Sequence, residues 1–285
     1  MVMNKKIIKN INIIVEYLIK YVILLIFLVF ALIPILWMIL TSIRPYLEIF
    51  STPPTLFVKN ITFENYYKVF SDKRFIGYFS NSLSVSIISA LFSLLISASA
   101  GYAFSRFTFK GKNLLFLSVI FCQLIPLMAI LIPLYTMFSQ LNLIDNPFAL
   151  VLSYFILTLP FSTWMSRAAF KQVPIEIEES ALIDGCNRFQ ALFKITLPIA
   201  APSLAAIFLF CFIEAWNEYV LAMTLINSTI KRTIQVGIML YRSEFYTEWG
   251  TLMAASTIAS IPIMIIFILI QKYLVSGLAA GALKR

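Results

Sequence analysis

Two carboxylates and one amide interrupt a strongly apolar stretch in the last third of the chain. Glu214, Asn217 and Glu218 are spaced at i, i+3 and i+4, and Trp216 lies between them. On a helix this spacing places the three polar groups on one face. Ionisable groups inside a membrane helix mark, by default, a path for solute or water. Carboxylates, an amide and an indole ring together suit a carbohydrate, so we expect these four residues to line such a path.

Two other interpretations of intramembrane polar groups stay open. The carboxylates could lie near the end of their span and simply reach the membrane interface. A further amide, Gln123, lies in an earlier apolar stretch. It is a weaker path candidate, because a lone amide also serves as a contact between helices.

The chain lacks the residues of several other chemistries. It contains no histidine, no nucleophile paired with a base, and no G-x-x-x-x-G-K-[ST] loop for nucleotide phosphates. Its cysteines, Cys122, Cys186 and Cys211, have neither the spacing of a metal site nor that of a disulfide framework. We therefore expect no catalytic residue, no metal ion and no cofactor bound by this chain.

The elements that must position these residues are membrane helices. Hydrophobic residues make up 61% of the 285 residues and charged residues only 12%, and a soluble domain could not bury that much apolar surface. A helix crosses the ~30 Å apolar layer of a bilayer with about 20 residues. Six stretches qualify: 21–40, 82–103, 114–138, 147–165, 204–226 and 252–274. The predicted fold is an all-α polytopic membrane protein with six transmembrane helices.

Local patterns add detail to three regions. The serine-rich stretch 82–103 should pack inside the bundle, because small residues let helices approach closely. Pro126 and Pro133 should kink the third span. In the loop 41–80, Thr62 should cap a short helix. One side of that helix would carry Phe63, Tyr66, Tyr67 and Phe70.

The basic residues predict the orientation. With the N-terminus in the cytoplasm, 14 Lys and Arg residues lie inside and 8 outside, as the positive-inside rule favours. The domain organisation is then a cytoplasmic segment at 1–20, a six-span domain at 21–274 and a cytoplasmic tail at 275–285. Loop 41–80 is external, and the polar stretch 174–198 is cytoplasmic.

The polar stretch 174–198 predicts a helix, a turn and a second helix. Pro174 suits the first helical position, and the glutamates that follow, Glu178 among them, favour an exposed helix start. Gly185 can adopt the left-handed conformation that closes a helix. The second helix should end at Pro198 and pack back under the bundle. Its packing face would comprise Phe189, Leu192, Phe193 and Thr196.

This stretch resembles the EAA loop of ABC-importer permeases, in the carbohydrate branch represented by the smaller permease of the maltose transporter. The resemblance rests on Glu179-Ser180-Ala181, Asp184-Gly185, Ile195 and Leu197-Pro198, with Ser180 in place of the usual alanine. Other matches extend it over nearly the whole chain: Asn81-Ser82-Leu83, Gly101-Tyr102-Ala103 with Arg106, Ile132-Pro133-Leu134-Tyr135, and the ending from Gly277 to Lys284. Taken alone, the stretch also fits a capped helix pair that merely connects two spans.

The resemblance implies a type I ABC importer permease fold, in which the first helix of the loop is a coupling helix that meets an ATPase subunit. The coupling residues would be Glu178, Glu179, Ser180, Ala181, Asp184, Gly185, Ile195, Leu197 and Pro198. The C-terminal tail would also reach the ATPase dimer, with Gly277 and Gly281 letting it run extended.

The resemblance also implies the partners. These are a second homologous permease subunit, two ATP-binding subunits that hold ATP and Mg, and an extracytoplasmic solute-binding protein. The complex would lie in a prokaryotic cytoplasmic membrane and import a sugar, an oligosaccharide, or a sugar or glycerol phosphate. Nucleic acid is not an expected partner, because the net charge of +9 resides in short loops between apolar stretches.

Two other classes of function remain to be distinguished. An ion-coupled secondary transporter would use Glu214 and Glu218 as relay groups, and its transport would stop when an uncoupler is added while ATP is maintained. A membrane scaffold or biogenesis factor would show no solute-specific defect on deletion. The EAA spacing favours the ATP-powered permease over both.

Overall fold

The structure is a computed structural model that describes the backbone of residues 2–53, 55, 58–242 and 246–282. Side chains are described for residues 15–272, except in the same gaps. The chain forms two compact units, Met1–Ser71 with Tyr241–Ile258, and Asp72–Leu240 with Ala259–Arg285. Within the described ranges the regular elements are helices, and one isolated antiparallel bridge pairs Arg242 with Thr247. The all-α prediction is confirmed.

The first unit contains α1 (Val2–Ser42), α2 (Tyr46–Ile49), α3 (Glu64–Ser71) and the start of α13 (Trp249–Ala282). From residue 15 to residue 37 every side chain of α1 is exposed. This stretch is almost wholly apolar, and a helix that is apolar all round is stable when lipid or other membrane helices surround it.

The short helix predicted after Thr62 is confirmed as α3. The Thr62 hydroxyl oxygen accepts a hydrogen bond from the Glu64 amide at 3.2 Å. The opposite face of α3 carries buried Asn65, whose side-chain amide donates to the carbonyls of Ser42 and Arg44 at 2.9 and 3.0 Å. Asn65 therefore fixes α3 against the end of α1. The aromatic side of α3 is largely exposed, at Phe63, Tyr67 and Phe70.

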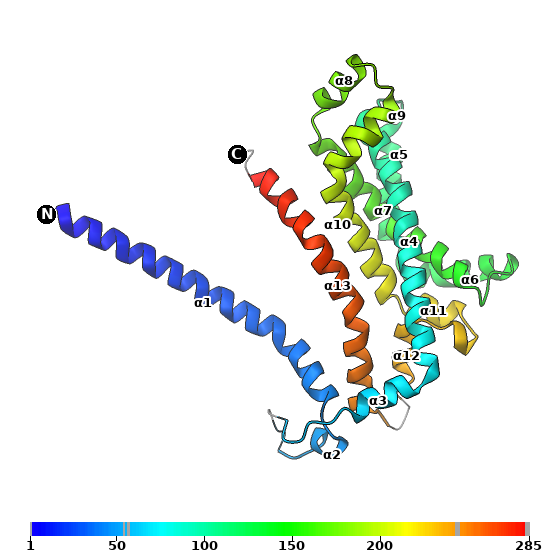
Figure 1. The fold of residues 1–285 in the computed structure, drawn as a ribbon. Helices are drawn as coiled ribbons and strands as arrows, with labels where there is room; N and C mark the ends of the chain where they lie inside the picture. Colours follow the sequence, from blue (N-terminus) through cyan, green and yellow to red (C-terminus); the bar gives the residue numbers. More distant parts are fainter. Residues whose placement is uncertain (1, 54, 56–57, 243–245, 283–285) are drawn as a thin grey trace. The chain divides into compact units, whose positions relative to one another are not determined.

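The second unit is built on three helices that pack side by side (Figure 1): α4 (Lys73–Arg106), α7 (Pro147–Gln172) and α10 (Leu197–Asn217). The inward packing of the serine-rich helix is confirmed, since α4 buries Ser82, Ser86, Ser89, Ser93 and Ser97.

Small residues let α4 and α7 approach closely. Ser93 Oγ lies 2.7 Å from Thr158 Oγ1 on α7. Further along α4, Gly101 has no room for a side chain, because a Cβ there would lie 2.5 Å from Ser166 Cβ and 2.6 Å from the Arg167 amide nitrogen. The separation of the two helices is therefore set at Gly101.

Among the described residues, five helices are long and apolar enough to cross a membrane, and one bent pair would make a sixth. The pair comprises α5 (Lys112–Phe121) continued by the 3-10 turn η1 (Cys122–Leu124), and α6 (Leu127–Gln140), at 98° to each other. Pro126 lies at the break, as predicted. Pro133 lies inside α6, which continues through it without a break. The kink predicted at Pro133 stays a prediction.

Several helix boundaries differ from the predicted spans. α1 begins at Val2 instead of residue 21, within the segment predicted as a cytoplasmic N-terminus, and α7 ends at Gln172 instead of residue 165. α4 begins at Lys73 instead of residue 82, because the Asp72 carboxylate accepts a hydrogen bond from the Arg74 amide at 3.0 Å and caps the helix. α10 ends at Asn217, short of the predicted residue 226. It is followed by α11 (Val220–Leu225), the 3-10 turn η3 (Thr229–Lys231) and α12 (Ile234–Met239).

The prediction that the C-terminal tail runs extended is also wrong for the residues up to Ala282, because they are helical. The backbone of Gly277 and Gly281 lies within α13, which continues to Ala282. The last residues, 283–285, and the contacts of the tail lie outside what the structure describes.

Candidate functional site

The helix pair of the polar stretch lies at the end of the second unit where α4 and α7 end (Figure 1). The first helix is α8 (Ile175–Ile183), and Pro174 precedes it as the N-cap instead of occupying the first helical position. Gly185 has φ 90°, as predicted. The Cys186 amide donates to Ala181 O at 3.0 Å and the Gly185 amide to Leu182 O at 3.2 Å, which together form a Schellman closure.

The second helix differs from the prediction because it does not end at Pro198. α9 (Arg188–Ala191) continues through the π-helix η2 (Leu192–Thr196) into α10 without a break. Proline clashes with the carbonyl of the preceding turn in an α-helix, and the wider π-turn relieves that clash. Pro198 then occupies the first turn of α10, where proline is tolerated.

The predicted packing face of this second helix is only half correct. Thr196 is buried and Leu192 is partly buried, but Phe189 and Phe193 are 76% and 64% exposed. The two aromatic rings are therefore free to meet a partner instead of packing under the bundle.

Glu178 forms the buried centre of this region, which contradicts its predicted exposure. Arg106 Nε at the end of α4 donates to Glu178 Oε2 at 2.9 Å, and both side chains are almost fully buried. The Tyr102 hydroxyl donates to Glu178 Oε1, and the Thr196 hydroxyl donates to Oε2 at 3.3 Å. Arg106 Nη2 also donates to Val173 O at 2.9 Å. One carboxylate thus joins α8 to α4 and to η2.

Half of the remaining predicted coupling residues lie on the outer surface of α8 and of the turn that follows it. Glu179, Ser180, Asp184 and Gly185 are exposed, as is Pro198 on α10. Ile183, which the prediction did not include, is 86% exposed. Ala181 is buried, Ile195 and Leu197 are partly buried, and Leu197 packs against the core cluster that contains Tyr102 and Phe170. The arrangement is an anchored helix with an acidic and apolar outer surface.

The structure separates the predicted path residues. Trp216 is 1% exposed, and its Nε1 donates to Ala259 O at 3.1 Å. Trp216 thus packs within this chain, and its place on a solute path stays a prediction. Glu218 lies beyond the end of α10, where its carboxylate accepts hydrogen bonds from the amides of Leu221 (2.7 Å) and Ala222 (3.1 Å) and caps α11.

The other three path candidates are exposed. Glu214 and Asn217 are both exposed on the last turn of α10, and Gln123 is exposed in η1. Of the three polar residues predicted to share one helical face, only Glu214 and Asn217 lie on α10, because this helix ends before Glu218.

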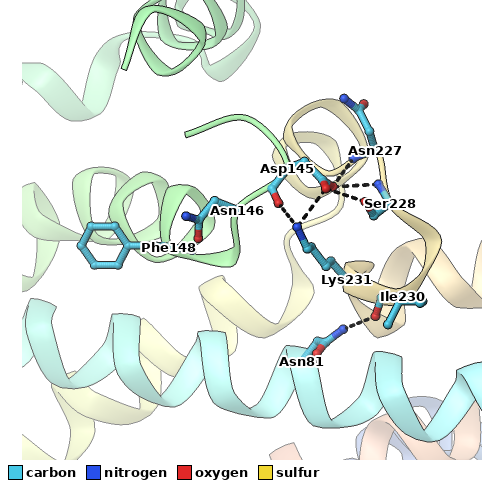
Figure 2. Close-up of polar contacts among 8 residues, drawn as sticks. All are labelled: Asn81, Asp145, Asn146, Phe148, Asn227, Ser228, Ile230 and Lys231. Atoms are coloured by element: carbon cyan, nitrogen blue, oxygen red, sulfur yellow. Dashed lines mark hydrogen bonds and ion pairs between the residues drawn. The ribbon is translucent and has the colours of Figure 1, made fainter. Parts of the chain in front are cut away.

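A second polar cluster, which the sequence did not reveal, lies near η3. Asp145, with φ 61°, accepts hydrogen bonds from the amides of Asn227 (3.1 Å) and Ser228 (2.7 Å) (Figure 2). Its carboxylate also meets the Ser228 hydroxyl and Lys231 Nζ, the latter at 2.9 Å. Asn81 on α4 donates to Ile230 O at 2.8 Å. We call the Asp145 contacts the clasp, because they tie the α6–α7 loop to the segment after α11.

The clasp should open when the Asp145 carboxylate is removed or protonated. The Ser228 hydroxyl and amide, and then Lys231, lower the pKa of Asp145 well below its usual value of 3.8. The stabilisation is therefore complete above about pH 4 and is lost as the pH falls further. In Asp145→Ala, amide hydrogen exchange at Asn227 and Ser228 should become as fast as in an open loop. Protection of both amides in this variant would contradict the role of the clasp.

The fold and this site define a multi-pass α-helical membrane permease. The chain belongs to the family described as "Binding-protein-dependent transport system inner membrane component", which matches residues 93–279.

Relatives and solved structures agree with this family. The sulfoquinovosyl glycerol transport system permease protein SmoH of Agrobacterium fabrum is 36% identical over 259 residues, 91% of each chain. The trehalose/maltose transport system permease protein MalG of Thermococcus litoralis is 37% identical over 90% of this chain and 92% of its own. A chain of a bacterial ABC transporter involved in the import of the acidic polysaccharide alginate superposes with a TM-score of 0.75 at 27% identity, covering 91% of this chain and 96% of that one.

Proposed function

We propose that this chain is the transmembrane subunit of an ATP-powered importer and carries a carbohydrate across the cytoplasmic membrane of a prokaryote. It would work with a second homologous permease, two ATP-binding subunits that hold ATP and Mg, and an extracytoplasmic solute-binding protein. The chain itself would catalyse no reaction and bind no cofactor. The observation that carries the proposal is the anchored α8, whose inner carboxylate is fixed by Arg106 while Glu179 and Asp184 face outward.

The proposed orientation places α8 and both termini in the cytoplasm, where the ATP-binding subunits dock. The end of the bundle that carries α8 also carries Arg106, Arg167, Lys171 and Arg188, in accord with the positive-inside rule. The clasp then lies at the external end.

The proposed mechanism is a two-state bundle that ATP biases. An ATP-binding subunit that moves α8 also moves α4 and α10, because Glu178 bonds to Arg106 and Thr196. Displacement of rigid helices is a common means of switching between two packed arrangements. The energy of nucleotide binding would in this way reach the helices that enclose the solute.

The proposed path residues on this chain are Glu214 and Asn217. Both are exposed on a membrane helix, where an uncovered carboxylate is costly unless it faces water, solute or a polar partner. The relatives named above transport sulfoquinovosyl glycerol and trehalose or maltose, according to their names. Hydroxyl-rich solutes of this kind suit carboxylate and amide partners.

The Glu179→Lys variant tests the docking role of α8. It should reduce the amount of ATP-binding subunit that co-purifies by about tenfold or more, because a like-charge contact across an interface costs several kcal/mol. Glu64→Lys on α3, another exposed glutamate at the proposed external side, is the matched control and should leave co-purification unchanged. Normal co-purification and uptake in Glu179→Lys would reduce α8 to a connector.

The proposed function is tested on the reconstituted complex in liposomes. Addition of the transported carbohydrate with its binding protein should stimulate ATP hydrolysis, and uptake should persist with an uncoupler as long as ATP is supplied. Uptake that stops with the uncoupler while ATP is maintained would establish the ion-coupled alternative.

A further inference from the structure

Three cations gather where α5 begins and α7 ends, two helices that pack against each other. Lys112 is the first residue of α5, and Arg167 and Lys171 lie in the last turns of α7. Arg167 and Lys171 are four residues apart on α7, and Arg167 lies against the ring of Phe116, which is four residues after Lys112 on α5. Among the described residues, none of the ion pairs involves any of the three. Like charges held together destabilise one another, so the cluster favours an external anion.

Arg167 is fixed within this cluster by an aromatic ring. Its guanidinium carbon lies 4.0 Å from the centroid of the Phe116 ring, and that ring is 6% exposed. Arg167 Nε is buried and has no hydrogen-bond partner within the described part of the chain. A cation on an aromatic face is held in one orientation, so the Nη donors of Arg167, not its buried Nε, are the groups that would meet a planar acceptor such as phosphate or carboxylate.

Lys112 is also positioned, although it retains free donors. Its Nζ donates to Phe107 O at 2.7 Å, and an ammonium group has three N–H donors. The backbone carbonyl therefore holds the side chain while two donors remain for another acceptor.

Exposed apolar side chains follow Lys112 along α5. On α5, directly after Lys112, Leu114 is 73% exposed, Leu115 52% and Leu117 49%. A ligand that combines an anionic head with long apolar chains would fill both surfaces, and a small free anion would fill only one. Basic pockets between transmembrane helices are known sites for anionic lipid headgroups.

We propose that Lys112, Arg167 and Lys171 form a binding site for the phosphate of an anionic phospholipid, whose acyl chains lie along the leucines of α5. The site is independent of the solute and lies beside the α8 region. A lipid bound there would bridge the start of α5 and the end of α7.

The experiment measures lipid retained by the importer complex, purified in detergent and titrated with phosphatidylglycerol or phosphatidylcholine, by native mass spectrometry. Wild type should retain phosphatidylglycerol in preference to phosphatidylcholine. The Lys112→Gln/Lys171→Gln double variant leaves Arg167 packed on Phe116, and it should bind phosphatidylglycerol about 30-fold more weakly, about fivefold for each lysine. Lys194→Gln, which removes an exposed lysine of η2, is the matched control and should behave like wild type.

Two results would overturn the proposal. One is retention of phosphatidylglycerol that is equal in wild type and the double variant, or no greater than that of phosphatidylcholine. The other comes from inorganic phosphate, added at millimolar concentration without lipid. If phosphate alone binds the wild type and the double variant abolishes that binding while lipid retention is unchanged, the site holds a free anion instead of a lipid. Neither result bears on the carbohydrate or on ATP coupling, so the lipid site can fail without the proposed function.

Discussion

The Arg106→Gln variant should lose about 3–5 kcal/mol of stability, because it leaves Glu178 as a buried charge without its partner. Glu178→Gln should cost a similar amount for the same reason. The double variant Arg106→Gln/Glu178→Gln should be more stable than either single variant, since neither buried charge remains. Thermal unfolding of the purified chain in detergent, read as a double-mutant cycle, measures the interaction directly.

The control for this cycle is the exposed pair between Lys68 and Glu64, at 3.2 Å. Lys68→Gln should change stability little, because water and salt screen exposed ion pairs. Additive losses in the Arg106 and Glu178 cycle would show that the buried pair is not the unit of stabilisation. In the assembled importer, the double variant should hydrolyse ATP with reduced uptake per ATP, because α8 has lost its charged link to α4.

The Gly101→Ala variant should weaken or displace the packing of α4 on α7, at a cost of about 1–3 kcal/mol. The added Cβ would meet the Ser166 side chain and the Arg167 backbone at distances that no van der Waals contact allows, and the backbone cannot rotate away. Gly77→Ala in the same helix is the matched control, because nothing lies within 4 Å of a Cβ at that position. It should be neutral or stabilising, since alanine favours a helix by about 1 kcal/mol over glycine. Equal thermal stability of the two variants would contradict the close approach at Gly101.

Sequence patterns predicted what local physics determines. The membrane helices follow from the length of the apolar stretches, the inward face of α4 from its serines, and the turn after α8 from Gly185. Pro126 was correctly placed at a break because proline removes a backbone hydrogen bond wherever it lies inside a helix.

The errors come from interactions that local patterns do not contain. Glu178 looked exposed because its partner Arg106 is 72 residues away in the sequence. The clasp was missed because Asp145 contacts Asn227 and Lys231, which follow it in the sequence by 82 and 86 residues. Glu218 was placed on one helical face with Glu214 from its spacing, but the helix ends at Asn217 and the Glu218 carboxylate caps α11. Pro198 fails to end its helix because a π-turn accommodates it.

The pairing of Arg106 with Glu178 also has a consequence for how the chain enters the membrane. Arg106 is synthesised 72 residues before its partner. In the proposed orientation it is therefore an unpaired positive charge on the cytoplasmic side while α4 is being inserted, and it helps to retain that end of the helix inside. When Glu178 emerges and α8 docks, the same side chain is neutralised and buried. In the proposed orientation, one arginine would thus act first as a topological signal during biogenesis and afterwards as the anchor of the finished helix pair.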